Sequence, residues 1–320
     1  MGSLKKDIGG VHPEQRQLLE IFEKAGQRHN YYDVFSTLID FCLHQYTAPE
    51  NLHAKDDFIF PSQYNTTEQA YFKTMLREVQ SICYKYCSLW NGVSSWYDPF
   101  GNLFESVSSD FSKQRAGQFF TPPSICDLMA QIIVEKPTAQ NIGNTCVDPC
   151  CGSGRLLLAS NAINAGLYHI GNDIDPLCTK MTALNFCLNG VIGEVSCNNA
   201  LQATSNNFRF GFKIVPLMSL FNNELSKLIF ALNPTYRRQY CILPLPFESC
   251  LIQQNEEKRE FFNAHVQTHV EHRNEIHPEG LQGILFEAEK INKEKKKTIA
   301  KESSKQKLST EEKFNLLFNL

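Results

Sequence analysis

Hydrophobic positions in the first third of the chain recur at helical spacing. A first amphipathic stripe begins at Leu18, and a cleaner one consists of Val34, Phe35, Leu38, Ile39, Cys42 and Leu43. The run Thr66–Gln69 has the composition of a capping box and predicts a helix that continues through Cys83. We therefore expect a helical N-terminal domain over residues 1–97, with these stripes forming its core.

From residue 98 to residue 250 the pattern changes to short apolar runs that alternate with helical stripes. Strands are predicted at 145–147, 167–170 and 194–197, and helices at 155–165 and 176–188. A further helix is predicted to be capped by Ser124, and its apolar face contains Ile125, Leu128, Met129, Ile132 and Ile133. Strands and helices in alternation predict an α/β fold, with a parallel sheet and helices on both faces.

The last part of the chain, residues 251–320, is rich in charge. Residues 290–307 hold eight lysines and two glutamates, which favours a solvated helix or a disordered tail. An arm that contacts phosphates is the alternative. Residues 228–232 are a candidate strand before Asn233, and between them and this tail only residues 240–247 have a strand-like pattern, so the sheet is expected to be short.

Composition narrows the classes of protein. The chain has 320 residues, of which 42% are hydrophobic and 20% charged, as is typical of a globular protein. It lacks a long apolar run and an apolar N-terminal leader, so we expect a cytoplasmic protein without a membrane segment. Twelve cysteines are scattered and show no paired C-x-x-C spacing, which favours reduced thiols and no metal. The net charge of −3 implies that any DNA contact is confined to a patch or supplied by a partner.

The strongest chemical signal is the sequence from Asp148 to Gly154, D-P-C-C-G-S-G, between a predicted strand and a predicted helix. Glycines at Gly152 and Gly154 allow a tight turn and a close approach of backbone to ligand. Ligands of open α/β sheets bind beyond the carboxyl ends of the strands, where Asp148 can accept a hydrogen bond from an ammonium group. The spacing matches neither the dinucleotide motif nor the nucleotide-triphosphate loop.

Asp173 follows the next predicted strand, in the sequence G-N-D-I-D-P. A carboxylate there suits the two hydroxyls of a ribose, and Ile174 then suits the face of an adenine. Asp173 taken alone would be read as a turn residue. Its place after the glycine loop favours the ligand-binding interpretation.

Three motifs in order now carry a resemblance to a known family. The sequence G-Q-F-F-T-P at residues 117–122, followed by D-P-C-C-G-S-G and G-N-D-I-D-P, resembles the modification subunit of type I restriction systems, a group of N6-adenine DNA methyltransferases. The sequence D-P-F-G-N-L-F-E at residues 98–105 resembles the family segment that precedes these motifs. The resemblance covers about residues 98–202 and implies a Rossmann-like fold that binds S-adenosyl-L-methionine.

The resemblance also implies the residues of the cofactor site. In the first motif it places Phe120 in the site and Thr121 and Pro122 against the methionine part. The residues implied to line the methionine and ribose are Asp148, Cys150, Gly152 and Gly154, and those implied for ribose and adenine are Asp173 and Ile174. Asn199 stands where the family has an aspartate near the adenine amino group, and keeps an acceptor oxygen without the charge.

The family transfers the methyl group with a motif Asn-Pro-Pro-Phe/Tyr, in which two oxygens accept the amine hydrogens and an aromatic ring stacks on the flipped base. The nearest counterpart is Asn233-Pro234-Thr235-Tyr236, so Asn233, Pro234 and Tyr236 are the predicted catalytic residues. Thr235 in place of proline frees φ and restores an N–H. In the alternative interpretation, residues 224–232 form a helix and Asn-Pro ends it.

The sequence thus leads to three hypotheses. The first is a subunit of an S-adenosylmethionine-dependent adenine-N6 methyltransferase, acting on double-stranded DNA with a specificity subunit. The second is a protein that binds the cofactor without transferring the methyl group and serves as a scaffold or regulator. The third is a methyltransferase acting on RNA or protein.

Overall fold

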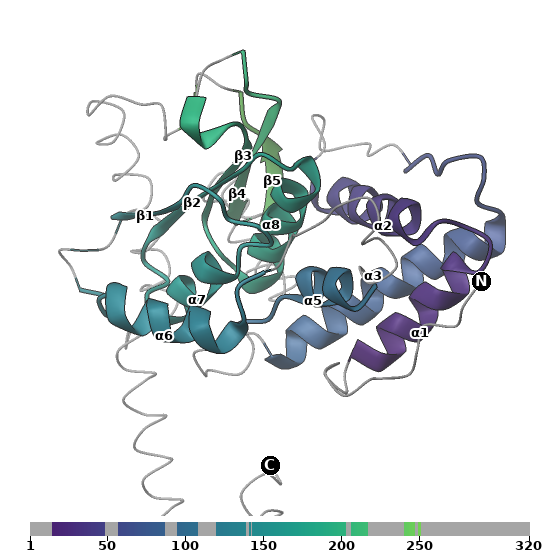
Figure 1. Ribbon diagram of the computed structural model, residues 1–320, viewed down its shortest axis with the longest axis horizontal. Coiled ribbons are helices and arrows are strands. Elements are labelled where there is room, and N and C mark those ends of the chain that lie inside the picture. The colour runs from purple at the N-terminus through teal and green to yellow at the C-terminus, as the bar shows by residue number, and fades with distance from the viewer. Residues whose placement is uncertain are drawn as a thin grey trace, which may run out of the picture. The chain divides into compact units, whose positions relative to one another are not determined.

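A five-stranded sheet forms the centre of the part of the chain that the structure describes. The computed structural model describes residues 15–48, 57–86, 95–107, 120–138, 141, 143–202, 206–216, 240–246 and 249–250. The strands lie in the order β1-β2-β3-β4-β5 (Figure 1). Their bounds are Thr145–Asp148 for β1, Tyr168–Asp173 for β2, Gly193–Cys197 for β3, Phe210–Pro216 for β4 and Tyr240–Pro244 for β5.

The first three strands are parallel, as predicted. Asp148 at the end of β1 pairs with Gly171, and Asp173 at the end of β2 pairs with Cys197, so the carboxyl ends meet at one edge. The strands β4 and β5 are antiparallel to their neighbours. The pattern did not predict β4. An antiparallel partner such as β4 needs no helical crossover from β3, whereas a parallel strand would require one.

Two helices connect the parallel strands. α7 spans Arg155–Ile163 and α8 spans Pro176–Asn189, close to their predicted bounds. The Asp175 side chain accepts from the Leu177 N–H and caps α8, with Pro176 at its first position. The two helices contact each other and pack on the same face of the sheet, because right-handed crossovers that advance in one direction place their helices on one side. For these two helices, the prediction of helices on both faces of the sheet is therefore wrong.

The N-terminal helices share a core with the sheet. They are α1 (Gln15–Gly26), α2 (Tyr31–Tyr46), α3 (Thr66–Tyr86) and α5 (Pro99–Val107). Phe22, Phe35 and Phe72 are fully buried among them, in a cluster that continues through Met181 of α8 to Val195 of β3. Helix α8 therefore lies between the sheet and α2 and is buried along most of its length.

The capping box of α3 begins one residue earlier than predicted. The Glu68 N–H donates to Asn65 Oδ1 at 3.0 Å, and the Asn65 N–H donates to Glu68 Oε2 at 2.8 Å. The side-chain oxygen of Asn65 accepts from a backbone N–H of the first turn, as that of Thr66 would. Glu68 follows three residues later, which is the spacing that a capping box requires. The helix was predicted correctly, but its cap was not.

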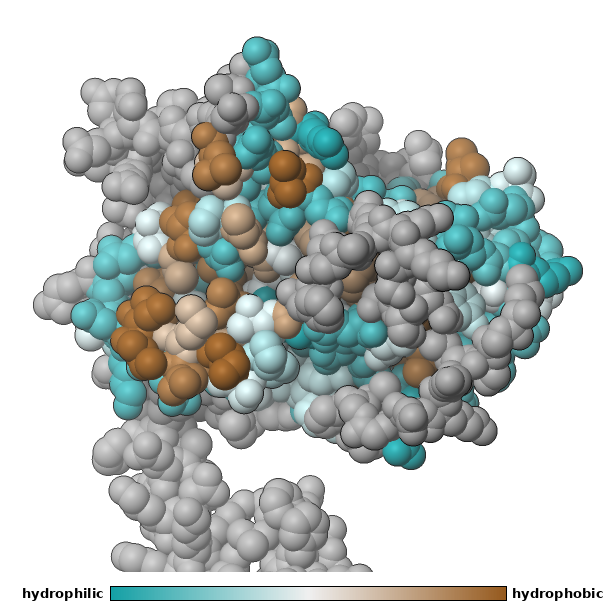
Figure 2. All heavy atoms as spheres, viewed as in Figure 1, coloured by the Kyte–Doolittle hydropathy of each residue, from teal (hydrophilic) through white to brown (hydrophobic). Residues whose placement is uncertain are grey.

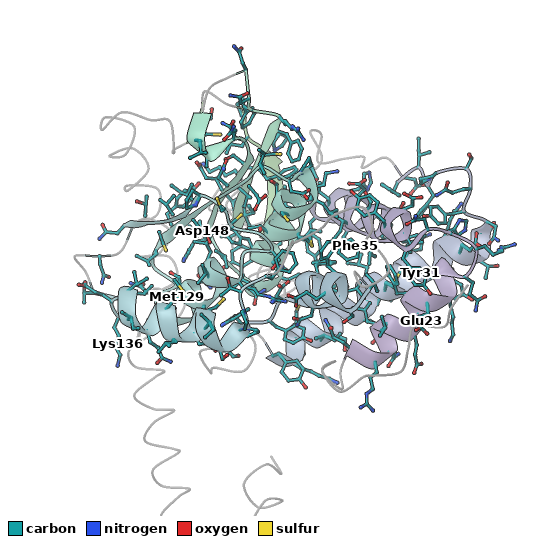
Figure 3. The ribbon with its side chains drawn as sticks, viewed as in Figure 1. Glu23, Tyr31, Phe35, Met129, Lys136 and Asp148 are labelled. Carbon is teal, nitrogen blue, oxygen red and sulfur yellow. The ribbon has the colours of Figure 1, made fainter. Side chains whose placement is uncertain are left out.

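Helix α6 (Pro123–Ile133) corrects a second expectation. Its cap position is Pro122, with Pro123 as the first helical residue, so Ser124 lies inside the helix and does not cap it. The helix packs on α7 through Cys126 and Ala130, whose small side chains permit a close approach. The predicted apolar face points outward instead, with Ile132 75% exposed. Figure 2 shows this face as a brown patch over α6, and Met129 is labelled on it in Figure 3.

None of the helices within the described ranges is both long enough and apolar enough to cross a membrane. The chain divides into two compact units, residues 1–267 and 268–320. The predicted charged tail, residues 251–320, lies outside the described residues.

Candidate cofactor-binding site

The glycine loop leaves β1 in a conformation that only glycine adopts freely. Gly152 has φ 57° and Gly154 has φ 90°, both in the left-handed region. The loop closes through a hydrogen bond from the Gly154 N–H to the Cys151 carbonyl at 2.7 Å. A Cβ on Gly154 would lie 2.9 Å from Thr182 Cγ2 of α8. The two glycines therefore fulfil the structural role expected from the sequence.

The loop brings the two predicted carboxylates to one edge of the sheet. The Gly152 N–H donates to Asp173 Oδ2 at 2.8 Å, and the Asp175 N–H donates to Asp173 Oδ1 at 2.8 Å. At the end of β1, where Figure 3 labels Asp148, the Cys150 N–H donates to Asp148 Oδ1 at 3.1 Å. Each carboxylate oxygen has a second lone pair, so both side chains retain acceptor capacity for a ligand.

The electrostatics of this edge favour a cation. Burial raises the pKa of the Asp148 carboxyl above its ordinary value. Burial also raises the pKa of Asp173, and repulsion by Asp175 and Asp148 adds to it, against the lowering effect of the two N–H donors. Carboxylates with raised pKa values lack full charge compensation. A positively charged ligand would supply it, and a phosphate would be repelled.

The far side of the edge carries the residues expected near adenine. Ile174 is 63% exposed and offers a free apolar surface beside Asp173. Asn199 Oδ1 accepts from the Leu201 N–H at 3.0 Å, so one lone pair of the expected acceptor is used locally, at the start of the short helix Ala200–Gln202. Cys150, also expected in the site, has an exposed, free thiol.

The residues Phe120–Pro122, which we call the strap, meet the glycine loop from the opposite side. A Cβ placed on Gly152 would lie 3.0 Å from Cδ1 of Phe120. The Phe120 ring also lies 5.6 Å from that of Phe104. The structure therefore brings the predicted cofactor residues of three separate motifs together. Their role in binding stays a prediction.

A buried ionic cluster beneath the loop was not assigned from the sequence. Asp98 is 1% and Arg155 3% exposed, and Arg155 Nε donates to Asp98 Oδ2 at 2.7 Å. Asp98 Oδ2 also accepts from Ser153 Oγ at 2.6 Å, which joins α5 to the glycine loop. An arginine directly after the last loop glycine, at the start of a mostly apolar helix, is the signal that would have drawn attention to it.

The predicted catalytic residues Asn233, Pro234 and Tyr236 lie outside the described residues. Their assignment stays a prediction.

Comparisons with known proteins place these observations in context. A family model described as N-6 DNA Methylase matches residues 95–303. The methylase subunit of the type I restriction enzyme MjaIX from Methanocaldococcus jannaschii is 26% identical over 113 residues, or 32% of this chain and 19% of the relative. The chain thus matches about a fifth of that relative's length. The type I restriction-modification methyltransferase subunit from Streptococcus thermophilus has a solved structure with 21% identity and a TM-score of 0.29, covering 56% of this chain and 37% of that one.

Proposed function

Because the chain belongs to the N-6 DNA methylase family, we propose that it is the cofactor-binding subunit of an S-adenosylmethionine-dependent adenine-N6 DNA methyltransferase of the restriction-modification type. One observation carries this proposal: a left-handed glycine loop holds Asp148 and Asp173 at the carboxyl edge of parallel strands. This edge is where open α/β sheets bind ligands.

The residues of this edge fit the parts of S-adenosylmethionine. Asp148 accepts from the ammonium group, Asp173 from the ribose hydroxyls, and Ile174 covers the adenine. The sulfonium and ammonium charges offset the two carboxylates whose pKa values burial raises. The cofactor supplies the methyl group, and the chain's own residues bind and orient it.

The charge of the chain and its cysteines bear on the partners and the compartment. A net charge of −3 leaves most of the contact with double-stranded DNA to a specificity subunit. Cys42, Cys126, Cys150 and Cys187 are free thiols, which suits a reducing, cytoplasmic compartment.

A second candidate is a protein that binds the cofactor without transferring its methyl group. The sheet register favours it. Pro216 at the end of β4 pairs with Tyr240 at the start of β5, at the end of the sheet opposite the carboxyl ends of β1–β3. Pro216 and Tyr240, the described residues on either side of residues 217–239, therefore lie at the end of the sheet away from the candidate site.

Methyl transfer distinguishes the two candidates. We expect the full chain to bind S-adenosylmethionine, and we would measure tritium transfer from the labelled cofactor to double-stranded DNA containing adenine. Transfer that Asn233→Ala abolishes supports the methyltransferase with its predicted catalytic residue. Binding without transfer supports the second candidate, and a chain that does not bind the cofactor contradicts both.

The affinity for S-adenosylmethionine is expected to fall as the pH is lowered from 7 towards 4. The cationic ligand binds the ionised carboxylates, and protons compete from a higher pH than for an ordinary aspartate with a pKa of 3.8. Lowering the pH has the opposite effect on the contribution of these carboxyls to the stability of the fold. A carboxyl whose pKa is higher in the folded than in the unfolded chain stabilises the fold as it becomes protonated. Calorimetric titrations across this range check the prediction, and Asp148→Asn should reduce the dependence. An affinity independent of pH would contradict it.

A further inference from the structure

The guanidinium of Arg155 joins three segments beneath the candidate site. Arg155 is the first residue of α7, directly after Gly154, and its side chain is 4% exposed. Nε donates to Asp98 Oδ2 at 2.7 Å, and Nη2 donates to Glu105 Oε2 at 2.8 Å. Asp98 directly precedes helix α5, and Glu105 lies within it. The charge is thus buried with one carboxylate that is fully enclosed and one that is 38% exposed.

The other donors of this guanidinium are also used. Nη2 donates to Asn102 Oδ1 at 2.8 Å, and Nη1 donates to Glu105 Oε1 and to the Thr121 carbonyl, each at 3.3 Å. A guanidinium has five N–H donors, and each has an acceptor here. Lysine keeps the charge but offers only three donors from a single atom, so it cannot reproduce this planar arrangement.

Arg155 holds the strap at two consecutive residues. It donates to the carbonyl of Thr121, and its Cζ lies 5.3 Å from the centre of the Phe120 ring. Phe120 in turn lies next to Gly152 of the glycine loop. One side chain therefore fixes the distance between the strap and the loop.

Asp98 fixes the orientation of that side chain. Its Oδ1 accepts from the Gly101 N–H and from Asn185 Nδ2, each at 2.7 Å, while Oδ2 accepts from Ser153 and Arg155. With four donors, this carboxylate has no freedom to turn. The position of Arg155 is thus determined by α5, α8 and the loop together.

We propose that Arg155 is a positioning residue for the amino-acid end of the cofactor: it holds the strap Phe120–Pro122 against the glycine loop. This inference rests on the proposed function. The adenosine end is expected at Asp173 and Ile174, and neither residue contacts the Arg155 side chain in the network described above. Loss of the guanidinium should therefore weaken the binding of ligands that carry the amino-acid group more than the binding of ligands that lack it.

Two ligands distinguish a positioning role of Arg155 from a general effect on the stability of the fold. S-adenosylhomocysteine carries the amino-acid group, and 5′-methylthioadenosine has the same nucleoside and sulfur without it. In Arg155→Lys we expect the Kd of S-adenosylhomocysteine to rise at least about tenfold and that of 5′-methylthioadenosine to change less than about twofold, by calorimetry on the full chain. Glu105→Gln removes the charge of the partly exposed carboxylate that holds the guanidinium. It should weaken the binding of S-adenosylhomocysteine more than that of 5′-methylthioadenosine, with a smaller change in Kd than in Arg155→Lys. This second variant keeps the test valid if Arg155→Lys folds poorly.

Lys180→Met is the matched control. Lys180 Nζ contacts Asp40 Oδ1 at 2.6 Å and links α8 to α2 away from the strap. Neither ligand should lose affinity in this variant. Equal losses for both ligands in Arg155→Lys and Glu105→Gln, or no loss in either variant, would overturn the positioning role. If the wild-type chain binds neither ligand nor S-adenosylmethionine, the proposed function fails instead.

Discussion

Gly152→Val is expected to reduce the affinity for S-adenosylmethionine by more than about a hundredfold, or roughly 3 kcal/mol. Gly152 has φ 57°, and a Cβ there would lie 3.0 Å from Cδ1 and 3.2 Å from Cε1 of Phe120. The branched side chain of valine must push the Phe120 ring, and with it the strap, away from the loop. The loop also supplies the Gly152 N–H to Asp173, so a distorted backbone misplaces the ribose acceptor as well.

The fold should survive this change. Backbone strain at one left-handed residue costs about 1–3 kcal/mol, and the loop is at the edge of the sheet. Gly143→Val is the control, because Gly143 has φ 84° but lies before the amino end of β1, where its N–H donates to Gly166. Gly143→Val should lose about as much free energy of unfolding as Gly152→Val, and its affinity for the cofactor should be unchanged. Calorimetry and thermal unfolding check both variants, and normal affinity in Gly152→Val would refute the proposed pocket.

Asp98→Ala is expected to destabilise the fold by about 3–5 kcal/mol, because the buried Arg155 charge would keep only the partly exposed Glu105 as its counter-charge. The Arg155 guanidinium would lose its enclosed counter-charge, and the donors from Gly101, Ser153 and Asn185 would lose their acceptor. The melting temperature should fall by roughly 10 °C.

Asp40→Ala is the matched control for this variant. Asp40 pairs with Lys180 near the surface and is 40% exposed, so its loss should cost less than about 1 kcal/mol. Thermal and denaturant unfolding compare the two. If Asp98→Ala were as mild as Asp40→Ala, the ionic cluster would not have the structural importance that its burial indicates.

The elements that the sequence predicted well are those specified by neighbouring residues. The glycine loop, β1–β3 and helices α7 and α8 each depend on a local signal, such as Pro176 after a capping aspartate. The exposed face of α6 was mispredicted because large apolar residues at helical spacing do not reveal which side is packed. Cys126 and Ala130 permit the closer approach, and that depends on α7. The antiparallel strand β4 was missed because strand pairing is not local.

The same distinction holds for the candidate site. Asp148 and Asp173 were found because each follows a strand, and parallel strands bring their ends together. Asp98 and Arg155, which are in contact, are 57 positions apart in the sequence. The cluster around them joins three structural segments. No spacing in the sequence encodes it. The motif at residues 98–105 was noted only as a resemblance, and its role emerged from burial and hydrogen bonding.

The central claim is that the acidic edge of the sheet binds S-adenosylmethionine. Calorimetric titration of the full chain and of Asp173→Ala with this molecule tests it most directly. We predict saturable binding to one site per wild-type chain and a loss of at least about tenfold in affinity in the variant, since the ribose hydroxyls lose a charged acceptor. Absence of binding to the wild-type chain, or equal affinity in Asp173→Ala, would contradict the account.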